Sequence, residues 1–100
     1  MNLFKLIFGE KVNLQEVISG GATIIDVRTK AEFQSGHLKN SINIPVDKLS
    51  QNIQKLNKNM PVVTCCASGA RSASARKILK SNGFEQVYNG GAWYSLRKYM

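Results

Sequence analysis

Short apolar runs and amphipathic stretches alternate along this chain, with turn residues between them. After a pair of glycines, residues 22–27 form a β-branched apolar run of strand length that ends in polar residues, which predicts a buried strand. Thr29 and Glu32 follow at the spacing of a capping box, in which the Thr side chain caps the first helical amides and the Glu side chain reaches back. A short helix is therefore expected to begin here and to stop by Gly36.

The same alternation continues to the C-terminus. Residues 46–56 place Val46, Leu49, Ile53 and Leu56 at spacings of three and four, which predicts one face of a helix. The other predicted elements are a first helix over 12–18, strands over 41–44, 62–65 and 86–88, a helix over 72–82 that ends at Gly83, a tight turn at Gly90 and Gly91, and a terminal helix over 92–99. Strands that alternate with helices require crossover connections, so the predicted fold class is α/β, with a parallel sheet covered by helices on both faces.

Ligands of such sheets bind beyond the carboxyl ends of the strands, which directs attention to the loop after residues 62–65. This loop reads Cys66-Ala67-Ser68-Gly69-Ala70-Arg71-Ser72. Small side chains allow the backbone amides to face a common anion at the mouth of the following helix. The same field, with Arg71 nearby, favours a thiolate, so Cys66 is the candidate nucleophile. Cys65 completes the strand pattern and is predicted to be a structural thiol.

Length and composition predict one domain over residues 1–100. The chain has 100 residues, of which 43% are hydrophobic and 20% charged, close to ordinary globular usage. Its two cysteines are adjacent and cannot staple a loop, which fits a reducing, cytoplasmic compartment. The apolar stretch at residues 3–8 is interrupted by Lys5 and is shorter than the roughly 20 residues of a membrane helix, so no membrane partner is expected.

Positive charge is concentrated in the second half of the chain. The 14 Lys and Arg residues exceed the 6 Asp and Glu residues, which gives a net charge of +8. Residues 51–100 hold eight of these cations and a single acid, Glu85. Such a field attracts small anionic substrates or acidic proteins, although a solvated surface explains it equally well. Nucleic acid is not an expected partner, because no helix-turn-helix, zinc finger or aromatic RNA-binding pattern is present.

Three blocks of the sequence resemble the rhodanese sulfurtransferases. They are the loop Cys66 to Ser72; then Ile25-Asp26-Val27-Arg28 with Glu32-Phe33, Gly36-His37-Leu38 and Asn43-Ile44-Pro45; and Tyr88-Asn89-Gly90-Gly91-Ala92-Trp93. The blocks follow the family order and span about residues 22–95. The resemblance implies a single rhodanese-like domain with a central, mainly parallel five-stranded sheet.

The resemblance also implies the roles of the loop residues. Cys66 would accept a sulfane sulfur as a persulfide from thiosulfate or a related donor and pass it to cyanide or a thiol. The implied substrate-binding residues are Ala67, Ser68, Gly69, Ala70, Arg71 and Ser72. The partners would be the small anionic donor and the acceptor, which includes a thiol-bearing protein, and a monomer is expected. No metal or cofactor is expected, since one histidine and two cysteines make a poor ligand set.

Four further side chains lie in these blocks, and structural roles are predicted for them. Asp26 and Arg28 follow the buried strand at the same sheet edge as the loop, so Asp26 is a candidate partner of Arg28 or Arg71. His37 is predicted to hydrogen-bond the backbone in a turn. Trp93 is predicted to be part of the core or a pocket wall.

Two other functions remain open from the residues alone. Read from Cys65, the loop has the spacing of cysteine-dependent phosphatases, with five residues before Arg71. The phosphatase hypothesis requires Cys65 to be the nucleophile. The other alternative is a sulfur-carrier or protein-binding module with little turnover of small molecules, in which Cys66 exchanges sulfur with a partner protein.

Overall fold

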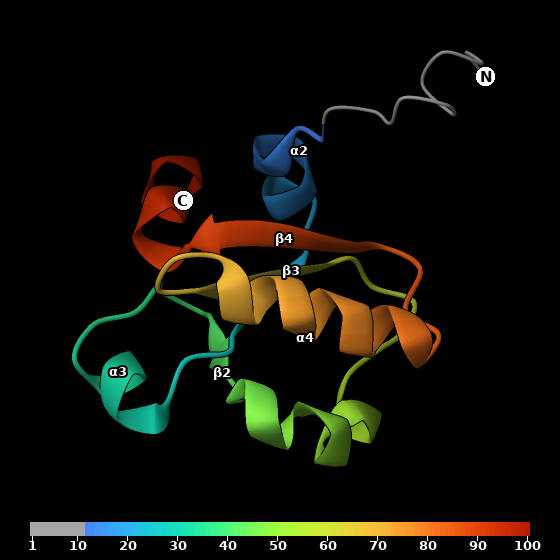
Figure 1. The fold of residues 1–100 in the computed structure, drawn as a ribbon. Helices are drawn as coiled ribbons and strands as arrows, with labels where there is room; N and C mark the ends of the chain where they lie inside the picture. The colour runs from blue at the N-terminus through green and yellow to red at the C-terminus, as the bar shows by residue number, and fades with distance from the viewer. Residues whose placement is uncertain (1–11) are drawn as a thin grey trace.

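The computed structural model describes residues 12–100, in which helices and strands alternate (Figure 1). The elements are α2 (Leu14–Ser19), β1 (Thr23–Asp26), α3 (Lys30–Gln34), β2 (Ile42–Asn43), the 3₁₀ helices η1 (Val46–Gln51) and η2 (Ile53–Lys55), β3 (Val62–Cys66), α4 (Ala70–Ser81), β4 (Val87–Ala92) and the 3₁₀ helix η3 (Trp93–Tyr99). The apolar stretch at residues 3–8 lies outside the described residues. Within residues 12–100, no helix is long and apolar enough to cross a lipid bilayer.

The strands form a sheet in the order β2-β1-β3-β4, and every neighbouring pair is parallel. Helices α4, η1 and η2 pack on one face of this sheet, and α2 and η3 pack on the other (Figure 1). The predicted α/β fold is therefore confirmed. The described part of the chain contributes four strands to the sheet, one fewer than the five expected.

The capping box predicted at the start of the second helix is confirmed. Thr29 is the N-cap of α3, and its Oγ1 accepts the N–H of Glu32 at 3.2 Å. The Glu32 carboxylate accepts the N–H of Thr29 in return, at 3.0 Å. Helix α3 ends at Gln34, before Gly36 as expected.

The helix predicted over residues 46–56 is instead two short 3₁₀ helices that meet at Asn52. The Asn52 side chain donates to the carbonyl of Lys48 at 2.8 Å, which is the acceptor that an α-helix would offer to the Asn52 backbone. The Asn52 N–H donates to Leu49 instead, at 3.0 Å. The predicted apolar face survives this change, because Leu49 and Ile53 are buried in the core.

The glycine pair near the C-terminus lies within a strand rather than in the predicted turn. Gly90 and Gly91 belong to β4, which continues to Ala92 with an irregular register against β3. A Cβ at Gly90 would lie 2.8 Å from Val63 Cγ1 and 2.9 Å from the Thr64 carbonyl oxygen. Close packing against β3 therefore requires this glycine. The terminal helix predicted over 92–99 is the 3₁₀ helix η3.

The pleat of β3 separates the two cysteines. Cys66 belongs to the core cluster on the α4 face of the sheet, with Val62, whereas Cys65 belongs to the cluster on the α2 face, with Val63. Successive side chains of a strand point to opposite faces, so the two thiols do not face each other. Both are free and fully buried.

Candidate active site

The loop that follows β3 wraps around the sulfur of Cys66. Cys66 is the last residue of β3, and α4 begins at Ala70. The N–H groups of Gly69 and Ser72 donate to Sγ at 2.9 and 3.4 Å. Burial raises the pKa of the Cys66 thiol, but these amides and the Ser72 hydroxyl together outweigh it, so its pKa is lowered. The arrangement stabilises a thiolate at the N-terminus of α4.

Two local features give the loop this shape. Gly69 has a φ of +111°, in the left-handed region that favours glycine, and this turn returns its N–H to the sulfur. The hydroxyl of Thr64 in β3 donates to the carbonyl of Ser72 at 2.9 Å and ties the first turn of α4 to the strand. The other sequence-predicted loop residues, Ala67, Ser68 and Ala70, are exposed.

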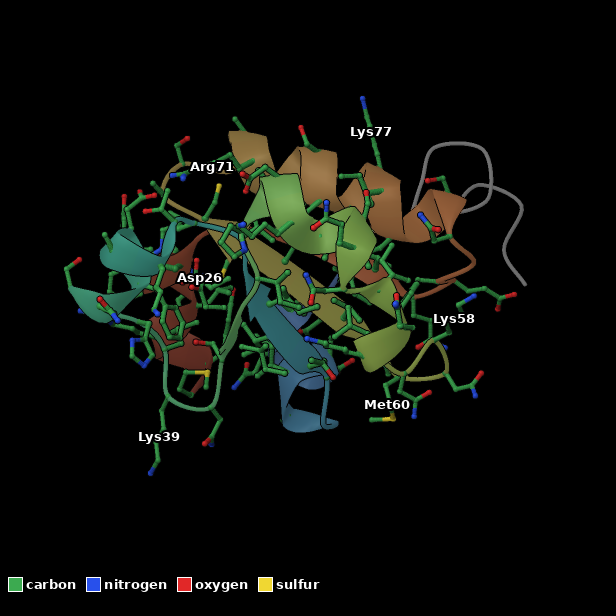
Figure 2. All side chains as sticks on the ribbon, turned by 90° about the horizontal axis from the view of Figure 1, so that it is seen from below. Asp26, Lys39, Lys58, Met60, Arg71 and Lys77 are labelled. Carbon is green, nitrogen blue, oxygen red and sulfur yellow. The ribbon has the colours of Figure 1, made fainter. Side chains whose placement is uncertain are left out.

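Arg71 forms an ion pair with Glu32 of α3. Its Nη1 and Nη2 donate to the two carboxylate oxygens at 2.7 and 3.0 Å. Arg71 thus lies on the side of the molecule where α3 packs (Figure 2). Hydrogen bonding by Arg71 and by Thr29 lowers the pKa of Glu32 to about 2. This pair connects the loop to α3, and the sequence analysis did not predict it.

Asn89 of β4 is a second site residue, one to which the sequence analysis assigned no role. The Ser72 hydroxyl donates to Oδ1 of Asn89, and Nδ2 of Asn89 donates to the carbonyl of Gly69 at 3.3 Å. The Gly91 N–H also donates to Oδ1, at 2.9 Å. Asn89 therefore connects β4 to both ends of the loop turn. Its separation from Ser72 in the sequence gives no spacing signal that could have identified it.

Asp26 pairs with Arg28 rather than with Arg71. Nη2 and Nε of Arg28 lie 2.7 and 3.0 Å from Oδ2 of Asp26, and the pair is buried at the end of β1. The remaining Arg28 donors bond the carbonyls of Glu32 and Gly36 at 3.2 and 2.7 Å. The predicted structural role is confirmed, because Arg28 fastens α3 and the turn after it to the sheet edge.

His37 and Trp93 also have the structural contacts that were predicted. His37 donates from Nδ1 to the carbonyl of Phe33 at 2.7 Å and stacks on the Phe33 ring. Trp93 packs against the core on the α2 face of the sheet. The guanidinium groups of Arg28 and Arg97 lie 4.6 and 4.8 Å from its ring centroid. Within residues 12–100, no group of three or more His, Cys, Asp or Glu side chains gathers as a metal site would require.

Cys65 is in an environment unlike that of Cys66. Burial, followed by the charge of Asp26, raises the pKa of the Cys65 thiol to about 12. Its side chain lies on the face of the sheet opposite to that of Cys66. The phosphatase spacing counted from Cys65 therefore has no thiolate at its first position.

Comparisons with known proteins agree in family. The family model described as a Rhodanese-like domain matches residues 11–92. The thiosulfate sulfurtransferase GlpE of Pseudomonas savastanoi pv. phaseolicola is 32% identical over 96 residues, which is 96% of this chain and 89% of that protein. A rhodanese with anions from E. coli has a TM-score of 0.72 and 30% identity, over 77% of this chain and 93% of that one.

The putative sulfur carrier protein YrkF of Bacillus subtilis is also similar, with 32% identity over 82% of this chain. The chain spans 42% of the length of YrkF and 54% of another Bacillus subtilis relative. This chain therefore matches only a part of each of these longer proteins.

Proposed function

Because this chain belongs to the rhodanese-like domain family, we propose that it is a thiosulfate sulfurtransferase in which Cys66 carries the transferred sulfur as a persulfide. The observation that carries the proposal is the pair of N–H groups, from Gly69 and Ser72, that donate to the Cys66 sulfur. These donors favour a thiolate, and the thiolate is the nucleophilic form of cysteine. A persulfide carries its negative charge on the outer sulfur, one bond beyond Sγ, where the positive N-terminus of α4 would still favour it.

The first half-reaction loads the sulfur. The Cys66 thiolate attacks the outer sulfur of thiosulfate, a new S–S bond forms, and sulfite leaves with the electron pair of the broken S–S bond. The amides at the start of α4 stabilise the negative charge before and after the step, because the helix N-terminus carries positive partial charge. No oxidant or reductant is consumed.

The second half-reaction removes the transferred sulfur from Cys66. Cyanide or a thiolate attacks the outer sulfur of the persulfide, and Cys66 leaves as the thiolate that the loop stabilises. With cyanide, the product is thiocyanate. This covalent route divides one transfer into two easier steps, and the same hydrogen bonds serve both. A reducing, cytoplasmic compartment suits this cycle, since it keeps the thiol of Cys66 free.

Access to the sulfur favours small reagents. Cys66 is 0% exposed, so the donor must displace part of the loop to reach Sγ. Ala67, Ser68 and Ala70 are the exposed residues of the loop, whereas Gly69 and Ser72 are held by hydrogen bonds. Arg71 would supply a positive charge to the donor at the edge of the loop while Glu32 keeps it in place.

Mass spectrometry of the intact protein tests this proposal. After incubation with thiosulfate, wild type is expected to gain the mass of one sulfur atom and to lose it on addition of cyanide, with release of thiocyanate. Cys66→Ser should gain nothing. Cys65→Ser is the matched control, because it changes the neighbouring thiol on the other face of the sheet, and it should load like wild type. Loading that survives in Cys66→Ser but not in Cys65→Ser would refute the assignment of the nucleophile.

A sulfur-carrier module is the second candidate. It is favoured by the pairing of Arg71 with Glu32, which reduces the positive charge available to a small anion, and by the similarity to YrkF. Such a module would take sulfur from a persulfide-bearing protein much faster than from thiosulfate. Comparing the two loading rates on the full chain distinguishes the candidates.

A further inference from the structure

The hydroxyl group of Ser72 has one proton and three neighbouring acceptors. Its Oγ lies within hydrogen-bond distance of Asn89 Oδ1, 3.0 Å from the carbonyl oxygen of Gly69 and 3.6 Å from Sγ of Cys66. Ser72 is 0% exposed, so bulk water does not supply a further partner. Because a hydroxyl donates one hydrogen bond at a time, the three acceptors compete for the same proton.

The amide of Asn89 is fixed with its oxygen toward Ser72. The N–H of Gly91 donates to Oδ1 at 2.9 Å, and an N–H must face an acceptor, so this atom is the oxygen and not the nitrogen. The other amide atom, Nδ2, donates to the carbonyl of Gly69 at 3.3 Å. Oδ1 of Asn89 is also the acceptor closest to the Ser72 hydroxyl. The hydroxyl proton therefore points to Asn89.

We propose that Asn89 is a positioning residue that holds the Ser72 hydroxyl proton away from Cys66 and thereby sets how readily the Cys66 thiolate forms. In the thiol form, S–H of Cys66 donates to Ser72 Oγ, and the hydroxyl donates to Asn89. The thiolate has no proton to donate, so the hydroxyl must turn from Asn89 toward Sγ to stabilise the charge. Every ionisation of Cys66 then breaks the Ser72–Asn89 bond. The proposal rests on the proposed function only in taking Cys66 as the reacting thiol.

The charged groups near the sulfur do not depend on Asn89. Arg71 of α4 is paired with Glu32 of α3. Asp26 and Arg28 of β1 are paired with each other, next to Cys65 on the other face of the sheet. Asn89 is uncharged, so a neutral replacement leaves all these charges in place. If a neutral replacement of Asn89 changes the pKa of Cys66, the change is therefore due to the position of the Ser72 hydroxyl proton and not to a change in nearby charge.

The test is the pKa of Cys66, taken from the pH dependence of its alkylation by iodoacetamide and located by peptide mass, in the full chain without any sulfur donor. Asn89→Ala removes the nearest competing acceptor and leaves only the Gly69 carbonyl at 3.0 Å, so the pKa of Cys66 is expected to fall, by about half a unit to one unit at most, the effect of one ordinary hydrogen bond. In the Ser72→Ala background the same substitution should leave the pKa unchanged, because no hydroxyl remains to turn.

Two further variants sharpen the test. Asn89→Asp retains an oxygen acceptor and adds a negative charge, so the pKa must not fall. Asn82→Ala is the matched control, since Asn82 bonds the carbonyl of Ile78 at the far end of α4, and it should leave the pKa of Cys66 as in wild type.

The proposal is overturned if Asn89→Ala shifts the pKa of Cys66 equally with and without Ser72. It is also overturned if Asn89→Ala raises this pKa or leaves it unchanged, or if Asn89→Asp lowers it. This experiment uses no sulfur donor. Failure to load sulfur from thiosulfate would therefore count against the proposed function and leave this result independent of it.

Discussion

The carboxylate of Glu32 takes part in two interactions, the capping box of α3 and the ion pair with Arg71. It closes the capping box of α3 by accepting the N–H and the hydroxyl of Thr29 at 3.0 and 3.1 Å. It also holds the guanidinium of Arg71 at the active-site loop. A single ionised side chain thereby fixes the start of one helix and the charged residue of another, which explains why its pKa is lowered to about 2.

Glu32→Ala is expected to destabilise the protein at neutral pH by about 1 kcal/mol, the sum of a lost cap and a partly exposed ion pair that solvent screens. Because the pKa of Glu32 is about 2 when folded and about 4.3 when unfolded, its contribution is fully present above the unfolded value. That contribution is lost as the pH falls from there toward 2. Urea unfolding of wild type and variant across this range measures the difference.

Thr29→Ala is the control for this prediction, since it removes the cap and leaves the Arg71 pair in place. It should therefore cost less than Glu32→Ala. A stability difference between wild type and Glu32→Ala that stays constant down to pH 2 would contradict the linkage.

Contacts between residues close in the sequence were predictable, and contacts between distant residues were not. The capping box was predictable because Thr29 and Glu32 are three positions apart and their types define the motif. The partners Arg71 and Asn89 were not predictable from spacing, because their contacts with Glu32 and Ser72 join different elements. Which of the adjacent cysteines faces the loop was predictable, since Cys65 completed the strand pattern.

At the scale of elements, strands β1 and β3 were predictable from their β-branched runs, and the parallel order followed from alternation with helices. Helix type was less predictable. The side chain of Asn52 donates to the carbonyl of Lys48, which an α-helix would pair with the Asn52 backbone. The segment therefore forms two 3₁₀ helices where the apolar spacing indicated one helix. The glycine pair did not mark a turn. Gly90 is required by close packing against β3, which the sequence does not display, and Gly91 by its positive φ of +76°.

Gly90→Ala should destabilise the fold by about 1–3 kcal/mol, the usual range for an overpacked core. The added methyl group would meet Val63 Cγ1 at 2.8 Å, the Thr64 carbonyl at 2.9 Å and Leu96 Cδ1 at 3.0 Å. Backbone and buried side chains cannot all withdraw, so β4 must shift away from β3. Thermal and urea unfolding monitored by circular dichroism measure the loss.

The neighbouring glycine provides the comparison for that prediction. Gly91→Ala meets no atom within 4 Å, but its φ is +76°, so its cost is backbone strain alone, about 1 kcal/mol. Gly90→Ala is therefore expected to be the more damaging of the two. If Gly91→Ala proves equally or more destabilising, close approach to β3 is not the reason for the glycine at position 90.

For the molecule as a whole, the net charge of +8 should act on the rate at which an anionic donor arrives. The second-order rate of sulfur loading from thiosulfate is therefore expected to fall as salt is added. The relevant range of ionic strength is the one that shortens the screening length from about 30 to 8 Å. Lys77 and Lys80 are exposed on α4, and Lys77 points away from the ribbon in Figure 2. The double variant Lys77→Glu, Lys80→Glu should lower the rate at low salt and weaken its salt dependence.

Alkylation of Cys66 by neutral iodoacetamide is the control, since an uncharged reagent should show little dependence on salt. A thiosulfate rate as insensitive to salt as the iodoacetamide rate would mean that the positive charge serves solubility and does not guide the donor.

The placement of the cysteine doublet on opposite faces of β3 also bears on how long a loaded molecule lasts. A persulfide next to an accessible thiol would decay within its own chain, by closing a disulfide and expelling hydrosulfide. Here the neighbouring thiol is sealed beneath the α2 face, so that internal discharge has no route. Under the proposed function, a persulfide on Cys66 would therefore persist until a second molecule accepts its sulfur, and the lifetime of the loaded protein would depend on acceptor concentration.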